Sequence, residues 1–395
     1  MKREESGLAL TFTLASSFLV QMVVGITGII VPLFAKHMGA TPLLLGFIGA
    51  AGGLTYTFMP LISGMLSDKF KRKTFITLST LLYGLSCIFY AMAENPHILI
   101  PIRALEWCSI ALFWPSAEAL LAEVGGKRID ETLEKFNLSW GSAMIVAPMI
   151  GGLLVNALGA DSKIPFISLS IILFALSCSS IPAIREGKEK PISRERRGKT
   201  ERERLNAHVI IAVIAIFLFA FVGGIIFNLF PAYAVDLDVS ASEIGLIMLF
   251  NGLFRLAAFL QAYRIESKIG EGRIFLMGSA AMSLALALTA LGRTTPAFLA
   301  VLSIMGFGAG ILYAESISIM LKNWRHARGY AAGLFESLIG TGYFLGSLLG
   351  GVVADKYAPN APYILGFLAS LAVTLALALK RPPKRDSGAE RLGPV

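Results

Sequence analysis

Residues 207–233 read AHVIIAVIAIFLFAFVGGIIFNLFPAY, a stretch without a single aspartate, glutamate, lysine or arginine. About 20 apolar residues in an α-helix are enough to cross the roughly 30 Å hydrocarbon layer of a bilayer. Lipid offers backbone N–H and C=O groups no hydrogen-bonding partner, so a helix is the expected conformation. This segment therefore predicts a transmembrane helix.

Similar segments recur along the whole chain. Of its 395 residues, 55% are apolar and only 15% are charged, and the mean hydropathy is +0.70. Soluble domains carry about 25% charged residues, which argues against an ordinary globular enzyme. The chain is expected to be an all-α integral membrane protein with twelve spans. The expected spans are 8–34, 43–66, 74–93, 97–121, 133–159, 164–184, 207–233, 243–264, 273–292, 296–321, 328–354 and 361–380.

The lysines and arginines lie unevenly between these spans. If both termini are cytoplasmic, 29 of the 35 basic residues fall on the cytoplasmic side, four on the outer side and two within spans. Cytoplasmic loops of membrane proteins carry such an excess, so the pattern predicts a multi-pass protein of the cell membrane with both termini cytoplasmic. It also explains the net charge of +9 without a nucleic-acid partner.

One long hydrophilic stretch divides the spans into two groups of six. Residues 185–206 contain nine basic and five acidic residues and read as a flexible cytoplasmic linker. The two groups resemble each other at a constant offset of 199 residues, for example Pro32 with Pro231 and Gly152 with Gly351. This repeat indicates a duplicated six-helix unit with a site between the repeats. The expected domains are a six-helix bundle at 1–184, the linker at 185–206, a second six-helix bundle at 207–380 and a cytoplasmic tail at 381–395.

The sequence carries no sign of a cofactor or a metal. Cys87, Cys108 and Cys178 lie singly in apolar segments and the four histidines are scattered, so neither a disulfide framework nor a metal-ligand spacing is present. A nucleotide-binding Gly-x-x-x-x-Gly-Lys-Ser/Thr loop and a Gly-x-Ser-x-Gly nucleophile elbow are also missing from the sequence. We expect no enzymatic activity and no cofactor.

The connection between the second and third expected spans reads GMLSDKFKRK at residues 64–73. It resembles the Gly-x-Leu-Ala-Asp-Arg-x-Gly-Arg-Lys signature of the major facilitator superfamily, although Lys71 stands where that family has glycine. The resemblance extends over all twelve spans and implies two pseudo-symmetric six-helix bundles. We hypothesise a latch in which Asp68, Arg72 and Glu123 form a charge network that closes the cytoplasmic face in the outward-open state, and the resemblance supports this role for Asp68 and Arg72. Gly64 permits close packing at the helix end.

Two further motifs resemble drug/proton antiporters of that superfamily. Span 5 carries APMIGG at 147–152, similar to the antiporter motif Gly-Pro-x-x-Gly-Gly, and span 11 repeats the pattern with serine for proline. Small residues let helices approach closely and a proline can kink a helix, so packing alone also accounts for these residues. In span 1, Thr27 stands where many drug antiporters have an acid, so proton coupling must use other residues. The helix-packing candidates are Gly141, Pro148, Gly151, Gly152, Gly342, Gly346, Gly350 and Gly351.

Charged and polar residues within spans are costly in lipid and usually functional. The sequence predicts a polar central cavity whose acids bind protons and whose bases bind solute; buried ion pairs that only orient helices are the alternative. Glu106 and Glu336 are the best coupling candidates, whereas Glu118 near the cytoplasmic end of span 4 reads as interface charge. The cavity candidates are Gln21, Arg103, Glu106, Asn228, Asn251, Arg255, Glu336 and Tyr343.

These features predict a monomeric secondary transporter that moves a small molecule across the bilayer by alternating access. Proton-coupled efflux is the favoured reaction, with protons as the coupling ion. Proton-coupled uptake or facilitated diffusion of a polar metabolite is the alternative, and Arg103 and Arg255 favour a solute with an anionic group. A channel or a membrane-embedded sensor is a further alternative, but the chain has neither a filter loop nor a soluble output domain in its sequence.

Overall fold

The computed structural model describes residues 2–67, 71–125, 129–184, 207–324 and 328–379. Over these residues the chain forms twelve α-helices long and apolar enough to span a membrane, joined by short connections that include a single 3-10 turn at Pro96–Ile98. The helices are α1 (Lys2–His37), α2 (Pro42–Ser67), α3 (Arg72–Met92), α4 (Leu99–Gly125), α5 (Ile129–Leu158), α6 (Ile164–Ala183), α7 (Ala207–Val235), α8 (Ala241–Ile269), α9 (Glu271–Leu291), α10 (Thr295–Asn323), α11 (Arg328–Lys356) and α12 (Ala361–Leu379).

All twelve expected spans are confirmed as helices, and most extend a few residues beyond the expected bounds. The start of α8 gives one physical reason for a helix that begins earlier than expected. The Ser240 hydroxyl accepts a hydrogen bond from the Glu243 N–H while the Glu243 carboxylate accepts from the Ser240 N–H, so a capping box begins the helix before the apolar run. Pro148 and Pro231 lie inside α5 and α7 without ending them. The proposed linker at 185–206 and the tail at 381–395 lie outside the described residues.

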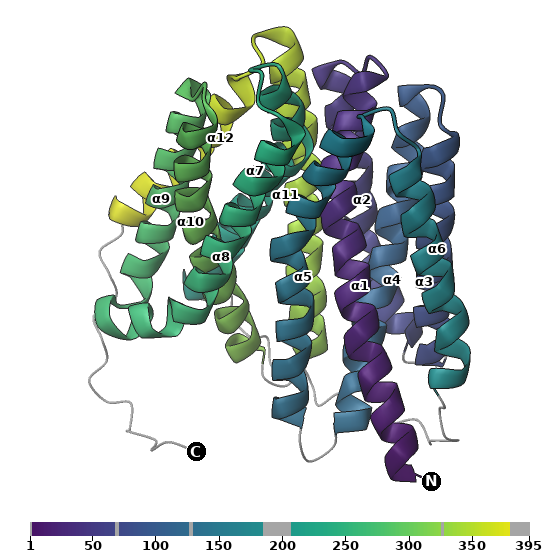
Figure 1. Ribbon diagram of the computed structural model, residues 1–395. Helices are drawn as coiled ribbons and strands as arrows, with labels where there is room; N and C mark the ends of the chain where they lie inside the picture. Colours follow the sequence, from purple (N-terminus) through teal and green to yellow (C-terminus); the bar gives the residue numbers. More distant parts are fainter. Residues whose placement is uncertain (1, 68–70, 126–128, 185–206, 325–327, 380–395) are drawn as a thin grey trace, which may run out of the picture.

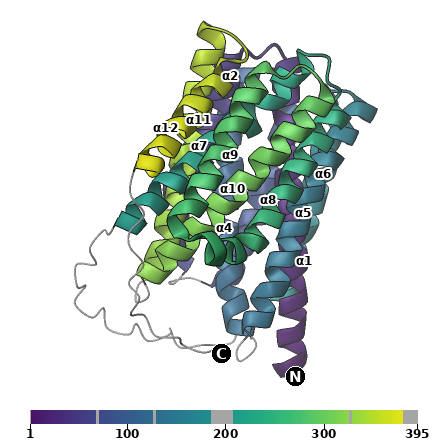
Figure 2. The same ribbon diagram turned by 90° about the vertical axis from the view of Figure 1, so that its left-hand side faces the viewer.

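The helices form two bundles of six, α1–α6 and α7–α12, which stand side by side in Figure 1. The second bundle faces the viewer in Figure 2. The bundles meet mainly along two seams, α2 against α11 and α5 against α8. The repeat of 199 residues places α2 in register with α8 and α5 with α11. One seam is therefore the symmetry equivalent of the other, as a duplicated unit requires.

Glycines bring the helices of both seams into close contact. A Cβ on Gly53 of α2 would lie 2.3 Å from the Phe344 nitrogen of α11, and one on Gly152 of α5 would lie 2.2 Å from the Ala241 oxygen of α8. No side chain fits in such a gap, so backbone packs directly on backbone. These seams hold the two bundles together.

The two ends of the structure differ in charge. One end carries Arg72, Lys73, Lys135, Arg264, Lys268, Arg273 and Lys322, and is called the basic end here; the marked N-terminus lies at this end in Figure 1. The other end, called the opposite end, carries Lys36, Lys163, Arg293 and Lys356. At the opposite end Lys36, in the last turn of α1, forms an ion pair with Asp236 just after α7, which links the bundles.

Candidate functional site

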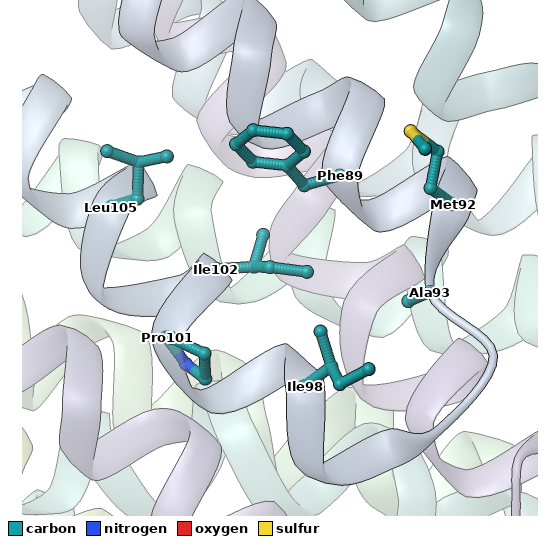
Figure 3. A pocket seen from close by; sticks show the side chains of 7 residues that line it. All are labelled: Phe89, Met92, Ala93, Ile98, Pro101, Ile102 and Leu105. Carbon is teal, nitrogen blue, oxygen red and sulfur yellow. The ribbon is translucent and has the colours of Figure 1, made fainter.

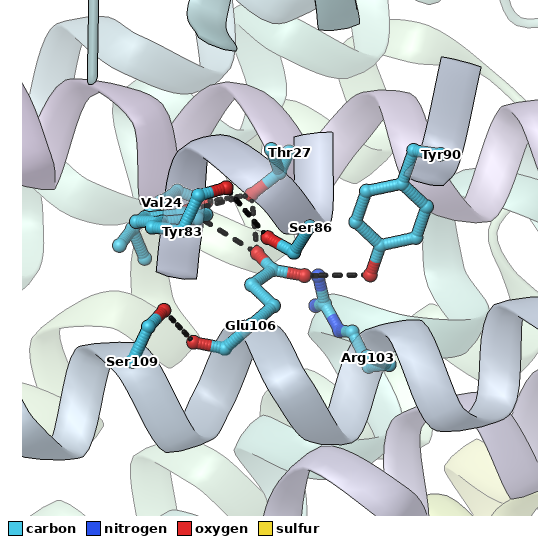
Figure 4. A network of polar contacts seen from close by, with 8 residues as sticks. All are labelled: Val24, Thr27, Tyr83, Ser86, Tyr90, Arg103, Glu106 and Ser109. Carbon is cyan, nitrogen blue, oxygen red and sulfur yellow. Dashed lines mark hydrogen bonds and ion pairs between the residues drawn. The ribbon is translucent and has the colours of Figure 1, made fainter. Parts of the chain in front are cut away.

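A fully satisfied carboxylate lies inside the first bundle. The Glu106 carboxylate accepts hydrogen bonds from Thr27 Oγ1 at 2.7 Å and the Tyr83 hydroxyl at 3.2 Å on one oxygen. Its other oxygen accepts from the Tyr90 hydroxyl at 2.7 Å and from Arg103 Nη1 at 2.8 Å (Figure 4). A carboxylate has four lone-pair positions, so these four donors saturate it.

The position of this network differs from the sequence-based expectation for Arg103 and Glu106. Both residues are almost fully buried, at 4% and 1% exposure, and their partners come from α1 and α3 of the same bundle. The pair therefore ties three helices of one bundle together, and the Arg103 guanidinium carbon also lies 5.7 Å from the centroid of the Trp107 ring. Thr27, at the position expected to lack an acid, is a hydrogen-bond donor to this carboxylate.

Aromatic side chains gather where the two bundles meet. Trp107 of α4 packs on Tyr56 of α2 with ring centroids 5.3 Å apart, and on Tyr343 of α11 with centroids 5.6 Å apart. Tyr343 in turn lies 6.3 Å from the ring of Phe227 in α7. The sequence predicted Tyr343 as a cavity residue, but Trp107, Tyr56 and Phe227 were not singled out by that reasoning as solute contacts. Together the four rings form a layer between the bundles.

Arg255 of α8 lies beside this aromatic layer. Its guanidinium carbon sits 5.6 Å from the centroid of the Phe227 ring, and Tyr343 and Tyr313 are within electrostatic range. The side chain is half-buried, its Nε is shielded and makes no hydrogen bond, and no carboxylate among the described residues lies within ion-pair distance. Arg255 is thus a cation that the surrounding protein does not neutralise.

Two carboxylates lie between the bundles, nearer to the basic end. Glu118 of α4 and Glu336 of α11 are within electrostatic range of each other, and Tyr56 forms a hydrogen-bonding interaction with Glu336. Glu118 is exposed and Glu336 is half-exposed, although both come from membrane-spanning helices. Among the described residues neither acid forms an ion pair with a cation. Both carboxylates are therefore accessible at the surface where the two bundles meet.

Sequence reasoning treated Glu118 as ordinary interface charge. Helical phase was the missed signal: Glu118 follows Trp107 by eleven residues, about three turns, so both side chains share one face of α4. Because Trp107 contacts α11, Glu118 points toward the second bundle as well. Glu336 and Tyr343 are similarly two turns apart on one face of α11.

Other predicted cavity residues make helix-packing contacts. Asn228 Nδ2 donates to Ser347 Oγ at 2.9 Å and to the Gly224 carbonyl at 3.1 Å, linking α7 to α11. Asn251 Nδ2 donates to the Leu302 carbonyl of α10 at 2.9 Å. Both asparagines are buried, whereas Gln21 is half-buried in α1.

The motif glycines occupy several kinds of surroundings. Gly152 and Gly351 lie in the seams between bundles, where an added Cβ would meet Ala241 and Gly46. Gly151 packs against α1, beside Pro148 of the same motif in α5. Gly141 would meet nothing within 4 Å. On α11, the glycines that pack against α7 are Gly342, Gly346 and Gly350.

The proposed latch is only partly within the described residues. Asp68 lies outside them, and Gly64 and Glu123 belong to helices at positions whose side chains are not described. Arg72, at the start of α3, donates from Nη1 to the Ala119 carbonyl of α4. This contact joins two helices of the first bundle at the basic end.

An apolar pocket of about 360 Å³ lies elsewhere, near the opposite end of α3 and α4 (Figure 3). All its lining side chains are apolar, and several of them are exposed, such as Met92 at 68%. A surface of this kind suits contact with lipid acyl chains and offers no polar group for a charged solute. The lining residues are Phe89, Met92, Ala93, Ile98, Pro101, Ile102 and Leu105.

Known proteins resemble this chain over nearly its whole length. The profile of the Major Facilitator Superfamily matches residues 13–236 and again 212–394, once for each half. An uncharacterised MFS-type transporter of Methanocaldococcus jannaschii is 26% identical over 92% of this chain and 96% of the relative. Multidrug resistance protein 1 of Bacillus subtilis is 23% identical over 96% and 98% of the two chains. Quinolone resistance protein NorA of Staphylococcus aureus is 23% identical over 92% and 94%.

Solved structures share the architecture. Two crystal structures of the nucleoside transporter NupG superpose with TM-scores of 0.79 and 0.75. Each is 15% identical and covers 94% of this chain, and 99% and 98% of the respective NupG chains. At this identity the likeness concerns the fold alone.

Proposed function

The chain belongs to the Major Facilitator Superfamily and is a transporter, not an enzyme; on that premise we propose that it exports a small solute in exchange for protons. Transport proceeds by alternating access, in which two bundles rock about a central site. The basic end faces the cytoplasm, because positive charge accumulates there, and the protein works as a monomer in the cell membrane. The domain bounds expected from the sequence, 1–184 and 207–380 with a linker between them, define the two moving bodies.

The main support for proton exchange is that Glu118 and Glu336 lie within electrostatic range of each other. One carboxylate comes from each bundle, so rocking of the bundles changes the distance between them. Protons then bind with different affinities in the two states of the transporter, and a ligand can drive a conformational change only through such a difference. Arg103 and Glu106 do not meet this requirement, since both belong to the first bundle and move as one body.

The names of two relatives support export as the direction of transport. Multidrug resistance protein 1 and NorA are named for resistance to drugs, which efflux produces, and they match this chain over more than nine-tenths of its length. A second candidate is uptake or facilitated diffusion of a polar or anionic metabolite, and the unneutralised Arg255 favours it.

Proteoliposomes with an imposed pH gradient test the exchange. A solute panel is screened for flux by mass spectrometry with the wild type, Glu118→Gln, Glu336→Gln and the double variant. We expect each single variant to lose gradient-driven flux and to keep counterflow of solute without a gradient. Asp355→Asn, an exposed acid at the opposite end of α11, is the matched control and is expected to behave as the wild type.

Three results would contradict the proposal in different ways. Gradient-driven flux that survives in the double variant rules out these two acids as the proton carriers. If wild-type flux does not depend on the pH gradient, the protein is a passive carrier without proton coupling. Flux that does not saturate and shows no counterflow identifies a channel.

A further inference from the structure

We propose that the space between the bundles binds a zwitterionic solute, with the anionic group of the solute on Arg255 and its cationic group between Glu118 and Glu336. This inference rests on the proposed transport function and names the class of solute for that site. It assigns Arg255 to specificity, with no part in moving protons.

The first support is the surroundings of Arg255. Its guanidinium stacks on Phe227 and is half-buried, and its shielded Nε makes no hydrogen bond. Shielding part of an arginine from water is costly unless an anion or several acceptors compensate it. Among the described residues no carboxylate does so. A carboxylate or phosphate on the solute would supply the missing partner in bidentate geometry.

The second support is the position of the two acids relative to this arginine. Arg255 is within electrostatic range of Tyr343, and Glu336 lies seven residues from Tyr343 on the same face of α11, roughly 10 Å closer to the basic end at 1.5 Å per residue. Tyr313 of α10 is within electrostatic range of Arg255, Glu118 and Glu336. The opposite charges therefore line one space at two depths.

The separation of Arg255 from the acids differs from the arrangement of the other intramembrane charge pair. Arg103 and Glu106 are 2.8 Å apart and neutralise each other within one bundle. Arg255 and Glu336 come from α8 and α11 of the other bundle, and the structure does not pair them. Opposite charges held apart in an accessible space attract a solute that carries both charges at a matching separation.

The side chains between the charges favour a flat, apolar linker in the solute. Tyr343, Trp107 and Tyr56 form a continuous aromatic surface on the same level as Arg255 and next to Glu336. Aromatic rings of a solute stack well on such a surface. An aromatic zwitterion combines all three requirements.

A matched set of probes tests the inference with purified full-length protein. Para-(aminomethyl)phenylacetic acid carries both charges, para-methylbenzylamine only the cation and para-tolylacetic acid only the anion. Isothermal titration gives the affinities and mass spectrometry gives counterflow in proteoliposomes. We expect the zwitterion to bind roughly tenfold or more tightly than either single-charge probe, because it gains a further charge-assisted contact.

Variants assign the two contacts. Arg255→Gln is expected to reduce zwitterion affinity to that of the amine and to leave amine affinity within about twofold, and Arg255→Lys to restore part of the preference. Glu118→Gln with Glu336→Gln is expected to reduce zwitterion affinity to that of the acid. Arg264→Gln, an exposed arginine at the basic end of α8, is the control and is expected to match the wild type.

The inference is overturned if the amine binds as tightly as the zwitterion, if none of the probes binds, or if Arg255→Gln weakens the zwitterion and the amine equally. The last result would assign Arg255 a structural role. A zwitterion preference without gradient-driven flux would refute proton exchange and leave this inference intact. Gradient-driven flux of other solutes without a zwitterion preference would refute this inference and leave proton exchange intact.

Discussion

The Arg103 guanidinium and the Glu106 carboxylate, 2.8 Å apart on one face of α4, point toward α1 and α3 of their own bundle (Figure 4). Intramembrane charges are usually assigned to transport. Here the two oxygens of Glu106 receive four hydrogen bonds from the same bundle, so the carboxylate has no free acceptor position for a solute. We expect the role of this pair to be the packing of three helices.

A stability measurement checks this role. Arg103→Met is expected to destabilise the protein by about 3–5 kcal/mol, because it leaves a buried carboxylate without its cation. Adding Glu106→Gln should recover part of that loss, since the glutamine is neutral, its amide oxygen accepts from the Tyr90 hydroxyl and its NH2 group donates to the Tyr83 hydroxyl oxygen. The measurement is unfolding in detergent, followed by tryptophan fluorescence.

The control for this pair is Arg264→Met, which removes an exposed arginine of α8 and should change stability by no more than about 0.5 kcal/mol. If Arg103→Met is as stable as this control, the pair does not hold the bundle together. If the double variant is less stable than Arg103→Met, the uncompensated carboxylate is not the cause of the loss.

Two glycines related by the internal repeat should respond differently to alanine. Gly141 of α5 and Gly340 of α11 are separated by the repeat offset of 199 residues. A Cβ on Gly340 would lie 2.4 Å from the Thr57 nitrogen of α2, in a seam between the bundles, whereas a Cβ on Gly141 would meet nothing within 4 Å. Gly340→Ala is therefore expected to cost about 1–3 kcal/mol through overpacking.

Gly141→Ala serves as the matched control, and it should be neutral or stabilise the protein by up to about 1 kcal/mol, because alanine favours the helix. Thermal unfolding of the two variants in detergent measures the difference, and counterflow measures its effect on transport. Because the α2–α11 seam joins the moving bundles, Gly340→Ala should also slow counterflow. Equal effects of the two substitutions would mean that the α2–α11 seam is not as tight as the structure has it.

The twelve helices were predictable from the sequence because a simple length and polarity rule governs membrane spans. The duplicated architecture was predictable as well, since one constant offset relates the halves. The partners of Glu106 were not: Thr27 and Tyr83 lie 79 and 23 residues away in sequence and carry no charge to mark them. Only the packing of α1 and α3 against α4 brings their hydroxyl groups to the carboxylate.

The candidate site was predictable in part. Arg255 and Glu336 were found because charges in the middle of a span are conspicuous. Glu118 was missed because it lies near a helix end, where charge is common, and its phase relative to Trp107 was not considered. Whether a charge faces its own bundle or the other one depends on the rotation of each helix, which a uniformly apolar span does not fix.

The ion pair between Lys36 and Asp236 joins the bundles at the opposite end, and its side chains are 27% and 52% exposed. Exposed pairs contribute about 0–1 kcal/mol, so Lys36→Gln should shift the equilibrium toward opening at that end by at most about fivefold. Distances between spin labels at Asp161→Cys and Arg293→Cys report the shift, with the exposed Cys178 and the half-buried Cys108 replaced by serine.

Lys163→Gln, at the same end, controls for lost positive charge and should leave the distances unchanged. Asp236→Asn alone and the double variant should reproduce the effect of Lys36→Gln, and about 1 M salt should reduce the difference from wild type because salt weakens the attraction between exposed charges. Additive effects of the two single substitutions would show that Lys36 and Asp236 do not act on this equilibrium through each other.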